Sequence, residues 1–257
     1  MDYVALIERF KDLPMIVVGD PMVDVYHWGH VDRISPEAPV PVFVEDREEF
    51  RSGGAANVGR QLISLGCNYR EYFPRPPWIE KHRYMVGSHQ MFRVDKELEY
   101  CSQYVLDHES PSAIVVSDYA KGAVQIMPRQ KVPIVVDPKG SDWLKYQGCT
   151  VICPNEKEYA QWDKRGDFAA ILVKRGANGM DLYENNRKVL HVEAKAKAVF
   201  DVTGCGDTVV AVLAATLGAS GSLDAGCQLA AHAAGYVAGE VGTAVCSAEK
   251  LKELVLA

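Results

Sequence analysis

Short β-branched runs recur along the sequence, most of them apolar throughout, and each ends in a turn-forming Gly, Asp, Pro or Asn. The runs do not alternate apolar and polar residues, which is typical of strands that are covered on both faces. Helical or turn segments separate them, so the sequence predicts an α/β fold with an open, mostly parallel sheet flanked by helices. The runs lie at 15–20, 113–119, 133–140, 150–158 and 170–176.

Polar side chains stand where most of these predicted strands end. Ligands of open parallel sheets bind at the carboxyl ends of the strands, so these side chains predict a binding site at one end of the sheet. They are Asp20, Asp118, Asp137, Lys139, Asn155 and Glu158.

Two segments interrupt the pattern of buried strands. Residues 34–47 contain three prolines and an alternating stretch, which indicates an edge strand or a flap. Residues 81–97 alternate loosely and are expected to pair with that flap. No internal repeat or linker is found, so we expect one domain over residues 1–257 with a small β-flap.

The last third of the chain changes character. Residues 181–194 predict a hairpin that turns at Asn185-Asn186. After it the sequence predicts helices, first over 208–219 and then within the Ala-rich stretch 222–242.

Composition excludes several classes of protein. Hydrophobic residues make up 48% of the 257 residues, enough to build a core, which excludes a disordered chain. The net charge of −6 disfavours nucleic acid as a partner. No run of about 18 apolar residues predicts a membrane span, and the first residues lack the layout of a signal peptide, so a cytoplasmic protein is expected. The seven cysteines have no framework spacing, which favours reduced thiols over disulfides, and Cys149 and Cys153 lack the second pair that a zinc site needs.

The strongest local signal is DVTGCGDT at 201–208, directly before an apolar helix. Backbone N–H groups of Gly204, Cys205 and Gly206 can converge on an anion at the helix N-terminus, where the helix dipole adds positive potential. Asp207 beside them suits a general base that takes a hydroxyl proton during phosphoryl transfer. An Asp cap on a glycine-rich turn is the alternative. The same dipole favours a reactive Cys205 thiolate, although Asp207 opposes it.

Three weaker signals accompany this loop. In 51–66, Gly53 and Gly54 allow a ligand to approach the backbone, and Asn57 lies in the first turn of the next helix. A glycine turn with an Asn cap explains the same residues. Asn155 and Glu158 share one face of a helix start and could hold Mg²⁺ through water. Asp24 could accept hydrogen bonds from sugar hydroxyls, or be an ordinary loop Asp.

The order of these signals resembles that of the ribokinase (PfkB) family of carbohydrate kinases over nearly the whole chain. In that family an early Asp and a Gly-Gly…Asn motif hold the sugar, N-x-x-E serves the metal, and a late D-T-x-G-x-G-D loop supplies the anion hole and the base. The resemblance implies a ribokinase-like fold, ATP as phosphoryl donor and Mg²⁺. The matching positions are Asp24, Gly53, Gly54, Asn57, Asn155, Glu158 and the loop 201–207.

Further segments look like those of heptose kinases within this family. They imply ATP-dependent phosphorylation of D-glycero-β-D-manno-heptose 7-phosphate at C1 to the 1,7-bisphosphate, on the route to ADP-heptose and lipopolysaccharide. They also imply a lid at 33–47 and 81–95, a homodimer that pairs through it, and no nucleotidyltransferase domain in 1–257. A kinase of another sugar or sugar phosphate and a non-catalytic binder of nucleotide or sugar phosphate remain the alternatives. The segments are 33–42, 53–58, 89–95, 117–122, 137–140 and 201–208.

The resemblance also assigns residues to the two substrates. Arg83 and Arg93 in the lid, with Lys81, could bind the 7-phosphate, and solvated charges are the alternative. Gly242-Thr243 resembles a loop that binds a monovalent cation in some relatives. The remaining sugar-side residues are Gln90, Asp118 and Lys121, and those on the nucleotide side are Lys139, Asn155, Lys174, Gly176, Gly179, Thr203 and His232.

The sequence departs from the family pattern at three places. Residues 67–81 replace a much longer strand–helix stretch, which leaves the choice of sugar open. Cys205 stands where Ala is usual, and His232 stands where Asn is frequent.

Overall fold

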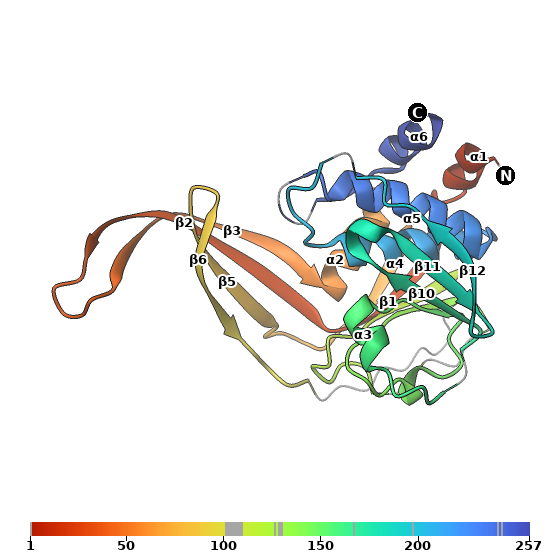
Figure 1. Ribbon diagram of the computed structural model, residues 1–257, viewed down its shortest axis with the longest axis horizontal. Coiled ribbons are helices and arrows are strands. Elements are labelled where there is room, and N and C mark those ends of the chain that lie inside the picture. Colours follow the sequence, from red (N-terminus) through yellow and green to blue (C-terminus); the bar gives the residue numbers. More distant parts are fainter. Residues whose placement is uncertain are drawn as a thin grey trace.

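An eight-stranded sheet forms the centre of the protein in the computed structural model, in the order β12-β11-β10-β9-β8-β7-β1-β4 (Figure 1). The structure describes residues 2–100, 110–125, 127, 131–166, 168–196, 198–240, 242 and 244–257. The six neighbouring strands β10, β9, β8, β7, β1 and β4 are parallel to one another, and β11 and β12 pair antiparallel at one edge. Their bounds are β1 (Pro14–Gly19), β4 (Asn68–Tyr72), β7 (Ala113–Ser117), β8 (Ile134–Asp137), β9 (Val151–Ile152), β10 (Ala170–Lys174), β11 (Met180–Glu184) and β12 (Arg187–Val192).

The five apolar runs form β1, β7, β8, β9 and β10, so the predicted mostly parallel sheet is confirmed. Their side chains alternate between two hydrophobic cores, one on each face of the sheet. Val17 and Val115 pack into one core, and Val18 and Val116 into the other. This explains why the runs are apolar throughout.

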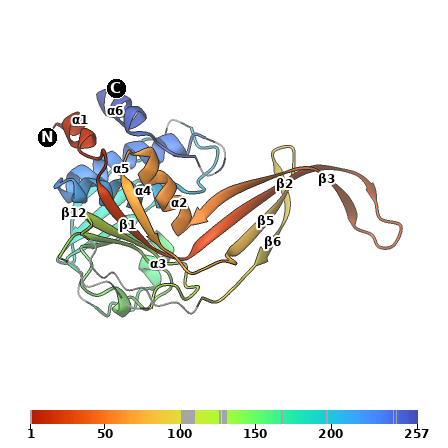
Figure 2. The same ribbon diagram turned by 180° about the vertical axis from the view of Figure 1, so that it is seen from behind.

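Helices cover both faces of the sheet unequally (Figures 1 and 2). One core packs against five helices: α1 (Tyr3–Glu8), α2 (Ala55–Ser64), α4 (Cys205–Gly218), α5 (Leu223–Val237) and α6 (Ala248–Leu256). The other core contains Trp143 and Trp162, stacked with ring centroids 4.8 Å apart, beside the short helix α3 (Glu156–Gln161). Among the described residues no helix has the length and apolar character needed to cross a membrane.

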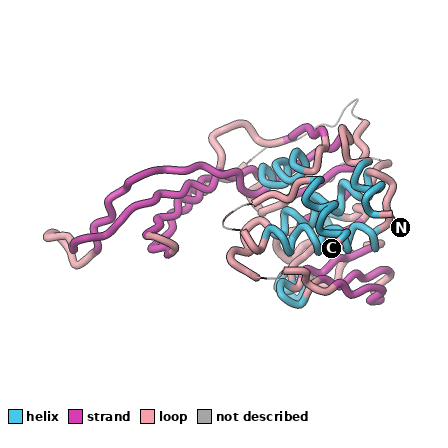
Figure 3. The backbone as a smooth tube through the Cα atoms, turned by 90° about the horizontal axis from the view of Figure 1, so that it is seen from above, coloured by secondary structure: helices cyan, strands magenta, loops and turns pink. Residues whose placement is uncertain are grey.

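A second, four-stranded sheet extends from the body as a long arm, which we call the lid (Figure 3). Its strands are β2 (Pro21–Ile34), β3 (Pro41–Gly54), β5 (Ile79–Val86) and β6 (His89–Lys96), in the order β3-β2-β5-β6. The segments predicted at 33–47 and 81–95 fall on strands of this sheet and on the turns that join them, but the sheet begins earlier, at Pro21. The half of β2 nearest the body is buried on both sides, so its sequence shows no alternation that would have marked it.

The predicted hairpin turns where expected. Asn185 and Asn186 link β11 to β12 with φ of 48° and 59°, the left-handed backbone that a two-residue hairpin loop requires. The predicted helices at 208–219 and 222–242 correspond to α4 and α5.

Candidate active site

Asp207 lies in the first turn of α4, at the end of the sheet where the parallel strands finish. Gly204 is the N-cap residue and has φ of 81°, a left-handed conformation that glycine adopts without strain. The Cys205 N–H donates to the Val202 carbonyl at 3.2 Å. The expectation that Cys205 contributes an amide to the anion site is therefore corrected. The amides of Gly206 and Asp207 follow it in the first turn, where helical N–H groups have no intrahelical acceptor.

Two side chains from other segments hold the Asp207 carboxylate. Asn57 Nδ2 donates to one oxygen at 2.7 Å, and Tyr119 Oη donates to the other at 3.2 Å. Asp207 is 6% exposed. Burial and the nearby charge of Asp137 raise its pKa to about 7, against the lowering effect of Asn57 and Tyr119. A buried carboxyl poised near neutral pH suits a general base.

The pKa of Asp207 predicts how activity depends on pH. Since only the carboxylate accepts a proton, kcat/KM should rise as pH increases through about 7 and level off above it. A family member whose base had an ordinary Asp pKa would show no such step between pH 6 and 8. Initial rates from pH 5.5 to 9 at constant ionic strength check this, and a flat profile would contradict it.

A buried ion pair stands beside this helix start. Lys174 Nζ donates to Asp137 Oδ1 at 2.5 Å, and both side chains are 15% exposed. Burial lowers the pKa of Lys174, but the attraction of Asp137 outweighs it and the pKa is raised. A Cβ on Gly206 would lie 3.3 Å from Lys174 Nζ, so the glycine lets this ammonium reach the anion-binding turn.

A cavity of about 560 Å³ opens at the same end of the sheet, a volume suited to a small-molecule ligand. Its walls come from loops after β8, β9 and β10 and from one side of α5, where Ala231, Ala234 and Gly235 leave room. Thr203 and His232 are not among its lining residues. Of the residues predicted for the nucleotide side, Lys139, Asn155, Lys174, Gly176 and Gly179 line it together.

Asn155 and Glu158 have a structural role besides lining the cavity. The side chain of Asn155 accepts from the backbone N–H of Glu158, and the side chain of Glu158 accepts from the backbone N–H of Asn155, both at 2.9 Å. This pair of bonds is a capping box at the start of α3. The second Glu158 oxygen accepts from Lys139 at 3.0 Å. Because Mg²⁺ keeps several waters in proteins, these residues and the Asp137 carboxylate fit a hydrated magnesium ion, whose preferred ligands are oxygens.

The sugar-side residues of the prediction gather where the lid joins the body. Asp24 lies inside β2 rather than in a loop and pairs with Arg83 Nη2 at 2.7 Å, with its side chain 6% exposed. A Cβ on Gly53 would lie 2.5 Å from Asp24 Oδ2, so any side chain there would displace the Asp24 carboxylate. Asn57 Oδ1 is buried and has no hydrogen-bond partner among the described residues, which leaves it an acceptor for a ligand hydroxyl.

Two predicted lid residues have different surroundings. Gln90 Oε1 accepts from Arg83 Nη1 at 3.3 Å, so Gln90 adjoins the Asp24–Arg83 pair. Arg93 lies opposite Arg83 in the β5–β6 pair but is bound to Asp95 at 2.7 Å, with its side chain 45% exposed.

The comparisons with known proteins decide the family. The model of the pfkB family of carbohydrate kinases matches residues 88–251, which is more than half of the chain. The chain belongs to the pfkB family of carbohydrate kinases. It is therefore a phosphotransferase whose acceptor is a sugar hydroxyl, and we refer to it below as the kinase.

Two curated relatives resemble the kinase over most of its length. "Bifunctional protein HldE" of Citrobacter koseri is 37% identical over 306 residues, and that of Yersinia pseudotuberculosis is 36% identical over 305. Each match covers 96% of this chain and 64% of the relative, so the chain spans about two thirds of their length. An alignment over 306 positions with a chain of 257 residues contains gaps, so this chain is shorter than the part of the relative that it matches.

Solved structures confirm the ribokinase-like fold. A ribokinase of Thermotoga maritima superposes with a TM-score of 0.73 at 14% identity, over 95% of this chain and 99% of that one. A ribokinase of Arabidopsis thaliana, solved with ribose and ATP, gives 0.68 at 15% identity over 95% and 98%.

Two further residues predicted for the sugar side, Asp118 and Lys121, form bonds with other side chains of the kinase. Asp118 accepts from Lys145 at 2.5 Å and from Tyr146 at 2.7 Å, and its side chain is 1% exposed. Lys121 pairs with Glu97 at 2.9 Å, near the base of the lid. Asp118 lines the cavity, whereas Lys121 is not among its lining residues.

The expected reactive thiolate at Cys205 is wrong. Burial, together with the charges of Asp201 and Asp207, raises the pKa of the thiol to about 11. The Sγ atom lies 3.8 Å from the Ala234 carbonyl on α5, to which it donates. Cys205 therefore stays protonated at neutral pH.

Sequence reasoning missed Tyr119 as a site residue, and it placed Asp20 and Asp137 at the binding end of the sheet without giving either a role. Asp20 accepts the backbone N–H groups of Tyr119, Lys121 and Ala123 and so fixes the loop that carries Tyr119. All three lie where a buried strand ends at the carboxyl end of the sheet, the signal that indicated Asp20 and Asp137 and that could also have found Tyr119.

Proposed function

We propose that the kinase transfers the γ-phosphoryl group of ATP to a sugar phosphate, with D-glycero-β-D-manno-heptose 7-phosphate, phosphorylated at C1, as the first candidate. The observation that carries the proposal is the position of Asp207. It contacts Asn57 from the sugar side and Tyr119 from the cavity wall, so it lies where a sugar and a nucleotide would meet. The likeness to the HldE proteins and to the heptose-kinase segments supports the choice of sugar.

The residues of the kinase suit each part of this transfer. The Asp207 carboxylate takes the proton of the sugar hydroxyl, whose oxygen forms a bond to the γ-phosphorus while the bond to the β–γ bridging oxygen breaks and ADP leaves. Amides at the start of α4 and the Lys174 ammonium face the phosphoryl oxygens and stabilise their charge. Mg²⁺, held near Asp137, Asn155 and Glu158, would neutralise phosphate charge when bound.

Binding of a monovalent cation at Gly242-Thr243 stays a prediction. Gly242 is described and its N–H donates to Asp201 at 3.0 Å, whereas Thr243 lies outside the described residues. One structural neighbour, phosphofructokinase-2 of Escherichia coli, was solved in complex with potassium. Activity in potassium compared with tetramethylammonium buffer tests the assignment.

The predicted binding of the substrate's phosphate group by the lid arginines can be tested by mutation. Arg83→Ala should raise KM for the phosphorylated sugar by about 10-fold or more, because one charge-assisted contact is lost, and leave KM for ATP nearly unchanged. Arg93→Ala should have the smaller effect, since Arg93 is exposed and bound to Asp95. Steady-state kinetics with each substrate varied in turn measure both constants. Equal rises for sugar and ATP would show that the lid has lost its structure instead.

We propose that two lids pair in a homodimer. Large apolar side chains of the lid are exposed, among them Phe50 at 65% and Phe92 at 47%, which favours burial against a second copy. Replacing both by Glu should convert a dimer into a monomer, whereas Val189→Glu, on β12 and 52% exposed, should not. Light scattering behind gel filtration gives the masses, and a monomeric unmodified kinase would refute the pairing.

Product identification tests the proposed reaction. Incubation of heptose 7-phosphate with ATP and Mg²⁺ should give a new phosphorus resonance coupled to the anomeric proton, as expected for the 1,7-bisphosphate. The gaps in the alignment favour the second candidate, a kinase of another sugar phosphate with a similar phosphorylated end. That candidate is preferred if heptose 7-phosphate is inert and another phosphorylated sugar gives a bisphosphate.

A further inference from the structure

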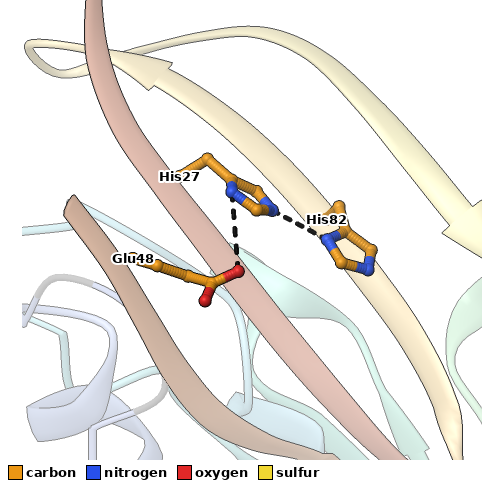
Figure 4. A group of neighbouring side chains, drawn as sticks. All are labelled: His27, Glu48 and His82. Carbon is orange, nitrogen blue, oxygen red and sulfur yellow. Dashed lines mark hydrogen bonds and ion pairs between the residues drawn. The ribbon is translucent and has the colours of Figure 1, made fainter. Parts of the chain in front are cut away.

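A chain of hydrogen bonds crosses one face of the lid, away from the residues assigned to the sugar. Asp24 and Arg83 point to one face of β2 and β5, whereas His27 and His82, each an odd number of residues from the neighbour on its own strand, point to the other. His27 Nε2 and His82 Nδ1 are 2.7 Å apart. Both rings are nearly buried, with side chains 8% and 11% exposed. Figure 4 shows the two rings edge to edge with Glu48 beside them.

The outer nitrogen of each ring faces a carboxylate. His27 Nδ1 lies 2.7 Å from Glu45, and His82 Nε2 lies 2.9 Å from Glu80. A carboxylate can only accept, so each ring donates its outer N–H. Two neutral imidazoles carry one proton each, and both protons are then used on the outside. The lone pairs of the two inner nitrogens therefore face each other, an arrangement that needs a cation between them.

Metal-binding histidines in proteins have this same surrounding, because their second nitrogen donates to a carboxylate that fixes the tautomer. A third ligand is at hand, since one atom each of His27, His82 and Glu48 lies within 4.8 Å of the others. The Glu48 carboxylate lies 3.7 Å from His27 Nδ1 and has to turn toward the gap between the rings to reach an ion there. Glu48 lies opposite His27 in the β2–β3 pair, and its side chain is 37% exposed, so it offers a path from solvent.

The charges of the group fit a dication. Three carboxylates, Glu45, Glu48 and Glu80, lie around the two rings, and among the described residues the ammonium that contacts them is that of Lys96, 2.9 Å from Glu80. This leaves two negative charges uncompensated. Imidazole nitrogens with a carboxylate are ligands that suit Zn²⁺ and its neighbours rather than Mg²⁺.

We propose that the lid binds one transition-metal dication of the zinc class through His27 Nε2, His82 Nδ1 and the Glu48 carboxylate, with water as fourth ligand. Zn–N bonds of about 2.0–2.1 Å in a tetrahedral site place two nitrogens roughly 3.3 Å apart, so the rings separate slightly when the ion enters. The ion joins β2, β3 and β5 on the face opposite the sugar. It stiffens the lid and takes no part in phosphoryl transfer.

Zinc binding is measured on the whole kinase, stripped with a chelator and free of nucleotide and sugar, so the result does not depend on the proposed function. Calorimetry should give one Zn²⁺ per chain, and Co²⁺ should give the visible absorption of a tetrahedral site. His82→Leu should lower the affinity by about 100-fold or more, since even loss of a supporting partner costs 10- to 100-fold. His89→Ala, an exposed lid histidine outside the group, should bind as the unmodified kinase does.

Thermal unfolding gives a second readout. Zn²⁺ should raise the melting temperature of the unmodified kinase and of His89→Ala, but not of His82→Leu. Should His82→Leu fail to fold, Glu48→Gln changes only a partly exposed side chain and must itself weaken binding. The proposal is overturned if the kinase takes up no stoichiometric zinc, in which case a proton fills the gap between the rings. It is equally overturned if His82→Leu, or Glu48→Gln in its place, binds zinc as the unmodified kinase does.

Discussion

Asp207→Asn should lower kcat by roughly 10²–10⁴-fold, the usual effect of losing a general base. The variant keeps the size of the side chain and one acceptor oxygen, so nucleotide binding and the fold should persist. Asn57 can still bond to it, because the amide of Asn57 offers both a donor and an acceptor, and its Oδ1 is without a partner among the described residues. Rapid-quench rates and ATP affinity by calorimetry measure the two effects separately.

The stability of the same variant provides its control. The pKa of Asp207 is raised in the folded kinase, so the folded state holds the proton more tightly than the unfolded chain. The stability that this proton contributes is lost as pH rises through about 7. Asp207→Asn avoids a buried charge and should melt no lower than the unmodified kinase at pH 8. An active Asn variant would remove Asp207 from the mechanism, and an unstable one would make its kinetics uninformative.

Asp24→Asn should lower kcat/KM for the sugar by about 100-fold and leave KM for ATP within about 2-fold. Asn cannot neutralise Arg83, and removing one partner of a nearly buried charge pair costs about 2–5 kcal/mol in a binding site. Asp32→Asn is the matched control, because Asp32 is on the same strand with its side chain 78% exposed. A comparable loss for both substrates, or for the control, would contradict a sugar-binding part for Asp24.

The sheet could be predicted because its strands carry their own signal. Val17 and Val18 must both be apolar when two cores cover the strand, and the turn residues after each run mark its end. Asp207 and the glycines before it could be predicted for a similar reason, since one short segment contains the helix start, the anion-binding turn and the base.

The rest of the site depends on contacts between distant segments. Asp207 meets Asn57, 150 residues away, and Tyr119, 88 residues away, and no local pattern indicates either contact. The direction of the Cys205 side chain is set by packing on α5, which reversed the expected effect of the helix dipole on its thiol. The length of the lid was underestimated because burial of β2 near the body hides its alternation.

Release of ADP across a panel of sugars and sugar phosphates tests the central claim most directly. The panel should include heptose 7-phosphate, other sugar phosphates and the matching unphosphorylated sugars, each with the unmodified kinase and with Asp207→Asn. We expect ADP release that requires a phosphorylated sugar, is greatest with heptose 7-phosphate and is nearly abolished in Asp207→Asn. Tight ATP binding without turnover of any sugar would contradict the account and would leave a non-catalytic binder of nucleotide or sugar phosphate in its place.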